Sequence, residues 1–524
     1  MSATRTSPAT SPDDEDIAPQ VRGSGLIFAA NLFAALVELV SQVVLVRALS
    51  KGQFGAFAFA IALVLFVQNV AVFGMPLTVS RFVPMRREAG DAGGLLGVIA
   101  TSVITVLVLG ALCVAGLAAG MALTPHDAVG PDSSRLVTTL AFLIPLEALI
   151  VTLTAVFATY GRTRAIVIRG SLVAPGLKLA VTSSLVLFGT SVEFVAVGWV
   201  CASLIGAVLY SWMCVGMLRG EGLLRPAVRR AVAWPWRELI PFASVALATT
   251  MVWACLEMSD AILLGALRGP TDVATMRAVT PFMRGYAIVL ASFLVLFAPL
   301  ASTYFARRDA SAMRQVYVRT ASWTTTLSFP VFLLTFVFPG ALVEGLYGAQ
   351  YESSGSVLMV LSIGYCIQAA TGFNGQVLKI HGYLRYTLIV DMIAVVLNVS
   401  LNLLLIGPLG ALGAAVGTSG TLIAHNALKQ VALRRLTGVT LWDPGYVRLL
   451  VIAALLTAAA AAIAALTGPS LLVACVVTLG ATLLLVRTTG ATLRIDETFP
   501  WAAGVPVLRR LLGLRAPART EGAA

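Results

Sequence analysis

The sequence predicts an all-α integral membrane protein with about fourteen transmembrane helices. Of its 524 residues, 58% are hydrophobic and only 11% are charged, whereas soluble domains contain roughly 25% charged residues. Long apolar runs recur along the chain, and a helix needs about 20 apolar residues to cross a hydrocarbon core about 30 Å thick. Because hydrocarbon satisfies no backbone amide, only helices and closed barrels span it, and runs this continuous lack the alternation of barrel strands.

The short polar segments between the apolar runs give the orientation. Loops that stay in the cytoplasm carry an excess of Lys and Arg. With the N-terminus inside, the cytoplasmic segments should be basic, and they are 76–93, 160–165, 218–239, 301–318, 379–383, 431–448 and the C-terminal tail. Together these segments hold most of the 36 basic residues. Lys429, at the end of a predicted span, is counted with the loop 431–448. Both termini are therefore predicted in the cytoplasm. The predicted spans are 25–46, 53–75, 94–121, 136–159, 166–189, 193–217, 240–266, 279–300, 319–338, 355–378, 384–406, 409–430, 449–467 and 470–486.

The longest cytoplasmic loop, 218–239, lies almost midway along the chain and divides it. The two halves of the chain open similarly, because Val46–Leu49 closes the first span and Leu264–Leu267 the seventh, each followed by a short turn with glycine. This layout suggests a weak internal repeat of the kind common in transporters that alternate access. The predicted domains are a disordered cytoplasmic tail (1–21), an N-terminal six-helix bundle (22–217), a linker (218–239), a C-terminal six-helix bundle (240–435), a helix pair (449–486) and a basic cytoplasmic tail (487–524). In the last tail, 500–515 reads either as an amphipathic helix on the inner leaflet or as a solvated segment.

Composition also argues against several function classes. The net charge of +12 is spread over many short loops, which does not indicate a nucleic-acid partner. The six cysteines lie in apolar runs without paired spacing, so we interpret them as packing residues. Three histidines are scattered, and neither a phosphate-binding glycine loop nor a nucleophile elbow occurs. The sequence predicts no enzyme, no metal and no cofactor.

Polar residues inside the spans are the best functional evidence in the sequence. A charge at the bilayer centre costs about 2.5–3.5 kcal/mol on insertion scales, so such residues should face a bundle interior or a wet cavity. In the first span Asn31, Glu38 and Gln42 are spaced i, i+7 and i+11, which places them on one stripe of a helix. That stripe either lines a polar passage or forms an interhelical hydrogen-bond network.

The seventh and eighth spans carry opposite charges. Glu257 and Asp260 share a face of the seventh span, and Arg277 and Arg284 share one of the eighth. Pairing of Arg284 with either acid would lower the insertion cost of both groups. That pair could be purely structural, or it could belong to a transport pathway.

Two further charged positions remain open to more than one interpretation. Lys178 of the fifth span could snorkel, neutralise Glu147 of the fourth span, or bind an anion. Asp391, Asn398 and Asn402 repeat the i, i+7, i+11 spacing in the eleventh span. We interpret the two asparagines as packing residues rather than ligand contacts.

Two regions of the chain carry a family resemblance. They are Arg47–Phe57 with Val72–Pro76 and Arg81–Pro84, and then Asp391–Asn398 with Leu401–Leu403 and Leu405–Ala415. In this order and spacing they resemble polysaccharide flippases of the Wzx type, in the multidrug/oligosaccharidyl-lipid/polysaccharide exporter superfamily. The resemblance covers roughly 22–486 and implies two six-helix bundles around a central cavity, with lipid-linked glycans turned over between the leaflets.

The implied function is a transporter that flips a polyprenyl-diphosphate-linked oligosaccharide across the cytoplasmic membrane for cell-surface polysaccharide biosynthesis. Guanidinium and ammonium groups bind phosphate oxygens. The expected partners are the lipid-linked oligosaccharide, membrane lipids, and a glycan polymerase and glycosyltransferases of the same pathway. The candidate residues are Arg284, Lys178, Arg277, Asn31 and Gln42 for substrate binding, and Glu38, Glu257, Asp260 and Asp391 for coupling or gating.

Two other functions compete with this interpretation. A drug or cation antiporter of the same superfamily would depend on the acids rather than on Arg284 and Lys178. A membrane glycan polymerase or ligase should need a sizeable outside loop with catalytic groups, whereas the outside segments here are short.

Overall fold

A computed structural model describes residues 32–123, 131–468 and 470–493. Within these ranges the chain is helical and contains no strand, which confirms the predicted all-α class. Asn31, the predicted N-terminal tail and residues 494–524 of the predicted C-terminal tail, which include 500–515, lie outside the described residues. Residues 487–493 of that tail belong to the last helix.

The chain forms two compact units, which do not follow the chain order simply. A helix over 32–48, α2, α4, α6 and α12 each have a unit boundary within or directly beside their bounds. The predicted domain boundaries stay a prediction. Unit 1 consists of Met1–Val44, Val67–Met121 and Thr138–Thr250, and unit 2 of Leu45–Phe66, Ala122–Val137 and Met251–Ala524.

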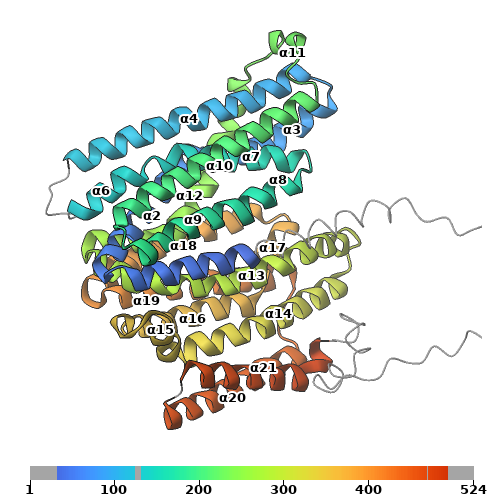
Figure 1. The fold of residues 1–524 in the computed structure, drawn as a ribbon. Helices are drawn as coiled ribbons and strands as arrows, with labels where there is room; N and C mark the ends of the chain where they lie inside the picture. The colour runs from blue at the N-terminus through green and yellow to red at the C-terminus, as the bar shows by residue number, and fades with distance from the viewer. Residues whose placement is uncertain (1–31, 124–130, 469, 494–524) are drawn as a thin grey trace, which may run out of the picture. The chain divides into compact units, whose positions relative to one another are not determined.

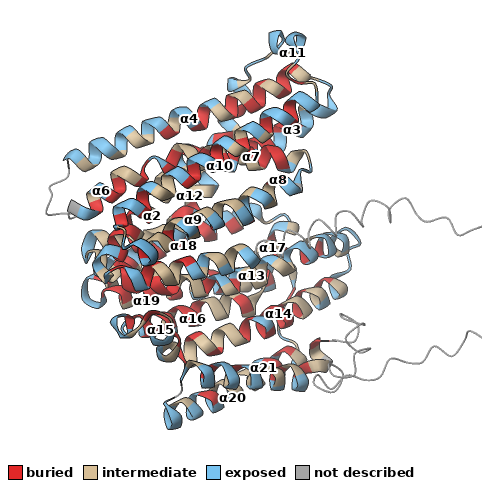
Figure 2. Ribbon diagram, in the orientation of Figure 1, coloured by how far each residue is buried: buried red, intermediate tan, exposed pale blue. Residues whose placement is uncertain are grey.

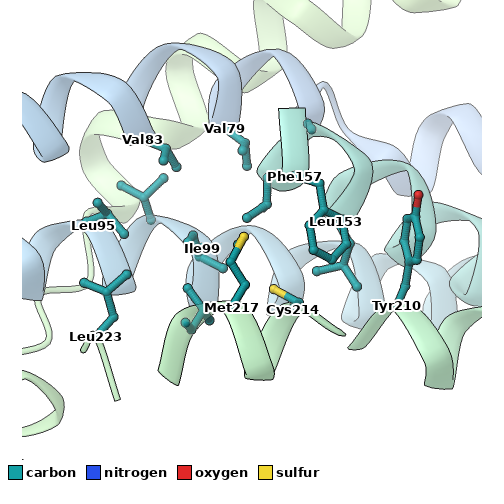
Figure 3. Packing of buried hydrophobic residues seen from close by; sticks show 14 of the residues in the cluster. Val79, Val83, Leu95, Ile99, Leu153, Phe157, Tyr210, Cys214, Met217 and Leu223 are labelled. Atoms are coloured by element: carbon teal, nitrogen blue, oxygen red, sulfur yellow. The ribbon is translucent and has the colours of Figure 1, made fainter. Parts of the chain in front are cut away.

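The core of unit 1 lies between α3, α4, α7 and α10. Figure 3 shows Val79 and Val83 of α3 near Leu95 and Ile99 of α4, and the cluster continues to α7 and α10. Phe157 and Tyr210 meet edge to face there, with ring centroids 5.0 Å apart. Unit 1 contains α3 (Met75–Glu88), α7 (Leu143–Thr159), α8 (Thr163–Val167), η1 (Ile168–Val173), α9 (Ala174–Phe188), α10 (Val192–Gly220), α11 (Pro226–Arg230), and parts of α2 (Lys51–Val72), α4 (Ala92–Leu123), α6 (Pro131–Leu140) and α12 (Trp236–Leu267) (Figure 1).

Unit 2 is built on helices α13 to α21. Helix α19 packs against α16 and α18, and α13 packs against α14. The last two helices form a pair, and their buried residues join a cluster with Phe329 and Leu333. Besides the remaining parts of α2, α6 and α12, its elements are α13 (Pro270–Ala306), α14 (Ala310–Phe332), η2 (Leu333–Val337), α15 (Pro339–Tyr347), η3 (Ala349–Tyr351), α16 (Ser354–Thr371), α17 (Asn374–Ile380), α18 (Leu384–Leu409), α19 (Ala411–Thr437), α20 (Pro444–Thr467) and α21 (Leu471–Leu493) (Figure 1).

Twelve of the predicted spans are confirmed as helical segments that are long and apolar enough to cross a membrane, among the residues that the structure describes. The first predicted span begins outside those residues and continues as the helix over 32–48. The predicted span 409–430 is α19, a helix of 27 residues that buries His425, Asn426 and Lys429. Its polar content distinguishes it from the other spans.

The predicted polar loop 76–93 is wrong in its local structure. Residues 76–93 contain the helix α3 (Met75–Glu88) instead of a loop. The joint before it is Gly74, which has a φ of +66° and where a Cβ would lie 2.5 Å from the carbonyl oxygen of Ala243. A glycine fits this close approach, and Pro76 then begins a helix without losing a hydrogen bond.

Exposed apolar side chains cover the outer helices. On α4 the buried residues end at Gly110, and Leu112 is 62% exposed. Figure 2 shows the same exposure along this end of α4 and along α20. Such large exposed apolar surfaces are what a lipid-facing helix requires.

Two π-helical turns interrupt the spans beside prolines. The turn η1 (Ile168–Val173) ends two residues before Pro175, and η2 (Leu333–Val337) follows Pro330. Proline cannot donate to the carbonyl four residues earlier, so it weakens the regular α-helical ladder. The carbonyl four residues before Pro175 is that of Ser171, which lies within η1, so Pro175 accounts for the change of helical phase in unit 1.

Candidate functional site: charged clusters inside the spans

Glu147 of α7 is the centre of a charged cluster in unit 1. Its Oε2 lies 3.1 Å from Nη2 of Arg169, and its Oε1 lies 3.9 Å from Nζ of Lys178. Ser203 of α10 donates its hydroxyl to Oε1 at 2.7 Å. Four elements, α7, η1, α9 and α10, thus bring one carboxylate, two cations and a hydroxyl together. The predicted alternative that Lys178 neutralises Glu147 agrees with this geometry.

The π turn explains how Arg169 and Lys178 reach the same carboxylate. Nine residues of a regular α-helix turn through about 900°, which would place these two side chains on opposite faces. A π turn accommodates one extra residue, so the effective spacing becomes about eight residues and the two directions differ by about 80°. Arg169 is the second residue of the π turn η1, and the rest of this turn precedes Lys178 and provides the shift.

Tyr210 anchors the π turn to α10. Its hydroxyl donates to the carbonyl of Ala165 at 3.2 Å, and the guanidinium of Arg169 lies 5.6 Å from the centroid of its ring. On the other side of the cluster, Lys178 Nζ lies 5.0 Å from the ring of Trp199. Two aromatic faces therefore hold the two cations in place.

The cluster is open mainly at Lys178. The side chain of Lys178 is 31% exposed, against 13% for Arg169 and 15% for Glu147. Nε of Arg169 is buried and has no hydrogen-bond acceptor. The cluster of Glu147, Arg169 and Lys178 carries a surplus of one positive charge.

In unit 2, Asp260 of α12 pairs with Arg277 of α13. Nη2 of Arg277 lies 3.2 Å from Oδ1 of Asp260 and also donates to the backbone carbonyl of Glu257 at 3.2 Å. Asp260 is buried, whereas Glu257 is exposed. The predicted charge attraction between these two spans therefore involves Arg277, seven residues before Arg284.

A second buried cluster of unit 2 joins α18 and α19. Oδ1 of Asp391 lies 2.7 Å from Nζ of Lys429 and 2.8 Å from Nε2 of His425. The three side chains are each no more than 10% exposed. Two turns further along α18, the carboxamide oxygen of Asn398 accepts from Ser259 and from Asn402. Asn398 thus joins α18 to α12, whereas its bond with Asn402 lies within α18.

Three further predicted residues, Glu38, Gln42 and Arg284, are described by their exposure. Glu38 is exposed and Gln42 is half-buried on the helix over 32–48. Arg284 is exposed on α13. Their roles in binding or coupling stay predictions.

Three cluster members are missing from the residues predicted from the sequence: Arg169, His425 and Lys429. Lys429, assigned to a cytoplasmic loop, is buried in α19, which continues to Thr437. His425 and Lys429 are spaced i, i+4, so they share a helical face. That spacing was the available signal, whereas nothing in the sequence spacing places Arg169 beside Glu147.

Solved structures define the class of this fold. The chain resembles the lipid II flippase MurJ in its inward closed conformation, with a TM-score of 0.66, 13% identity, and coverage of 90% of this chain and 99% of that one. It also resembles a multidrug resistance MATE family transporter of the MOP superfamily, inward-facing (TM-score 0.62, 15% identity, coverage 77% and 94%), and the MATE multidrug transporter DinF-BH (0.59, 15%, 84% and 100%). The fold is that of MOP superfamily transporters, as the sequence resemblance predicted.

Family comparison then gives the family itself. The model of the family described as polysaccharide biosynthesis protein matches residues 20–297, more than half of the chain. The chain belongs to this polysaccharide biosynthesis protein family. A second family model, MatE, matches residues 246–404. None of the curated protein sequences matches this chain.

Proposed function

We propose that this protein moves a polyprenyl-diphosphate-linked oligosaccharide from the inner to the outer leaflet of the cytoplasmic membrane, for cell-surface polysaccharide biosynthesis. Membership of the polysaccharide biosynthesis protein family supports transport of a glycan precursor. The observation that carries the proposal is the positive surplus of the cluster formed by Glu147, Arg169 and Lys178. A diphosphate crossing a bilayer needs cations that are already desolvated, and uncompensated charge at this depth is too costly to keep without use.

The mechanism follows from the chemistry of the headgroup. Alternating access of the two helical bundles would expose a bound headgroup to one side of the membrane and then to the other. In the proposal Lys178, Arg277 and Arg284 bind the diphosphate, and Asn31 and Gln42 contact the sugar. Glu38, Glu257, Asp260 and Asp391 couple the movement to an ion or to the membrane potential, which is worth about 2.3 kcal/mol per charge at 100 mV.

The test is flipping by the reconstituted protein. Proteoliposomes would contain a polyprenyl-diphosphate oligosaccharide, and protection of the sugar from an added glycosidase would report the leaflet it occupies. We expect Lys178→Gln and Arg284→Gln to lower the rate at least tenfold. Arg307→Gln, an exposed arginine at the end of α13, serves as the matched control and should flip like the wild type. Equal rates in all four proteins would refute the proposed role of the cations.

A drug or cation antiporter is the second candidate. The match of the MatE model to residues 246–404, which include the exposed carboxylate of Glu257, favours it. Under this alternative, Glu257→Gln would abolish uptake of an organic cation into proteoliposomes, and Lys178→Gln would leave that uptake intact. The opposite pattern would exclude the antiporter.

The cellular setting is also part of the proposal. Both termini would lie in the cytoplasm, and the protein would work beside a glycan polymerase and glycosyltransferases of the same pathway. Labelling of single cysteines placed in 379–383 and in 348–353 would report the two sides. If a reagent outside intact cells labelled 379–383, the predicted orientation would be wrong.

A further inference from the structure

The hydrogen bonds of Glu147 leave part of the cationic cluster uncommitted. Oε2 accepts from Arg169 and Oε1 accepts from Ser203, at 3.1 and 2.7 Å. Lys178 is 3.9 Å from Oε1, beyond hydrogen-bond distance. The ammonium of Lys178 and the Nε–H of Arg169 therefore remain as donors that Glu147 does not satisfy.

These two donors suit an anion with several oxygens. Burying the N–H of a guanidinium without an acceptor is unfavourable, so a ligand oxygen that reached Nε would remove this penalty. An ammonium acts as a point charge for phosphate, and a guanidinium can offer two parallel N–H groups. Lys178 is the most exposed member of the cluster and gives the approach.

Glu147 opposes the binding of such an anion. Its carboxylate uses the same kind of donor as a phosphate and adds a negative charge a few ångströms away. An ion pair of Glu147 and Arg169 alone would have no net charge and would not attract an anion. Lys178 adds one positive charge, so the cluster as a whole attracts an anion weakly. A transporter must release what it binds, so a fixed opposing charge that weakens binding is useful to it.

We propose that Arg169 and Lys178 form a binding site for a phosphate group, and that Glu147 is its built-in competitor, held in place by Ser203, which keeps the affinity low. The identification of the phosphate as that of the transported lipid rests on the proposed function. The site itself depends only on the contacts within unit 1.

The test measures binding of inorganic pyrophosphate to the full-length protein by calorimetry. Glu147→Gln keeps the shape and an acceptor oxygen but removes the charge. Because two unit charges about 6 Å apart interact strongly in a protein medium, we expect pyrophosphate to bind at least tenfold more tightly. Lys178→Gln and Arg169→Gln should bind it at least tenfold more weakly. Glu344→Gln, at an exposed carboxylate of α15, is the matched control and should bind like the wild type.

Ser203→Ala provides a second test with the opposite sign. Without the hydroxyl, Oε1 of Glu147 is free to move onto Lys178, so binding of pyrophosphate should weaken severalfold. If Glu147→Gln does not fold, Ser203→Ala and Lys178→Gln decide. The site would be overturned if folded Glu147→Gln bound pyrophosphate no more tightly than the wild type. It would also be overturned if both Ser203→Ala and Lys178→Gln bound pyrophosphate like the wild type.

A lipid arm separates the two sources of phosphate. Polyprenyl diphosphate in mixed micelles should show the same order of variants and should displace inorganic pyrophosphate, if the site takes a lipid headgroup. Binding of inorganic pyrophosphate alone would limit the site to free phosphate and overturn its part in lipid transport. If the wild-type protein does not flip the lipid-linked oligosaccharide but the variants bind pyrophosphate in the expected order, only the proposed function is refuted. If the wild type flips the lipid but the variants do not show this order of binding, only the site is refuted.

Discussion

Replacement of Asp391 should destabilise unit 2 more than replacement of either of its partners. Asp391→Asn leaves the ammonium of Lys429, which is 8% exposed, without its carboxylate. Breaking a buried ion pair by removing one member costs about 3–5 kcal/mol because the other charge stays buried. Lys429→Met leaves Asp391 bonded to His425 at 2.8 Å, so its cost should be smaller, about 1.5–3 kcal/mol, the usual contribution of a hydrogen bond to a charged group.

The double variant Asp391→Asn/Lys429→Met separates the pair from the two positions. Replacing both charges of a buried pair is often nearly neutral, so the double variant should be more stable than Asp391→Asn alone. Equilibrium unfolding in mixed micelles, followed by tryptophan fluorescence, measures the four free energies and gives the coupling between the residues. Lys379→Met, the same change at an exposed lysine of α17, is the control and should alter stability by less than about 0.5 kcal/mol.

The cycle also decides between two roles for Asp391. If Asp391→Asn lowers the free energy of unfolding by less than about 1 kcal/mol, with or without Lys429→Met, the ion pair does not stabilise the fold. The structural role of Asp391 would then be refuted. If the double variant recovers stability but not flipping, Asp391 acts in coupling as well as in structure.

Two more predictions concern packing and local order. Gly97→Ala should destabilise unit 1 by about 1–3 kcal/mol, because its Cβ would lie 1.7 Å from the carbonyl oxygen of Ala233. The Cβ of the control Gly116→Ala meets nothing within 4 Å, so this variant should unfold like the wild type in the same assay. Equal stability of the two variants would contradict the close approach of Gly97 to Ala233. Arg47→Ala should increase hydrogen exchange in 345–353 without a change in global stability, because Arg47 donates to the carbonyls of Gly345 and Leu346 at 2.9 and 2.6 Å; unchanged exchange there would show that these bonds do not hold α15.

The spans were predictable because lipid constrains them one segment at a time. A run such as 94–121 must be a helix for reasons that depend on its own residues and on the bilayer, and the helix α4 follows it within two residues at each end. The loop 76–93 failed because its polar residues resemble a solvated loop, whereas Gly74 and Pro76 begin a helix that buries Val79 and Phe82. The close approach of Gly74 to Ala243 is a tertiary contact, which a local sequence pattern does not predict.

The charged clusters were only half predictable for a related reason. Polar residues inside spans are visible in the sequence, which is why Lys178, Asp260 and Asp391 were identified. Their partners depend on helix rotation and phase. Arg169 in a regular helix would point away from Lys178, and only the π turn before Pro175 brings the two together.

The charge balance of the clusters separates structural pairs from a site for a ligand. Asp391 and Lys429 cancel and are at most 10% exposed, so they meet their insertion cost between themselves. The cluster of Glu147 retains one uncancelled positive charge, and its most exposed member is the lysine whose carboxylate contact is the longest. Substitution of Lys178 by a neutral residue would remove that surplus and leave a neutral ion pair between Glu147 and Arg169. Lys178 is therefore the residue that the proposed anion site requires, since the pair of Glu147 and Arg169 is already neutral without it.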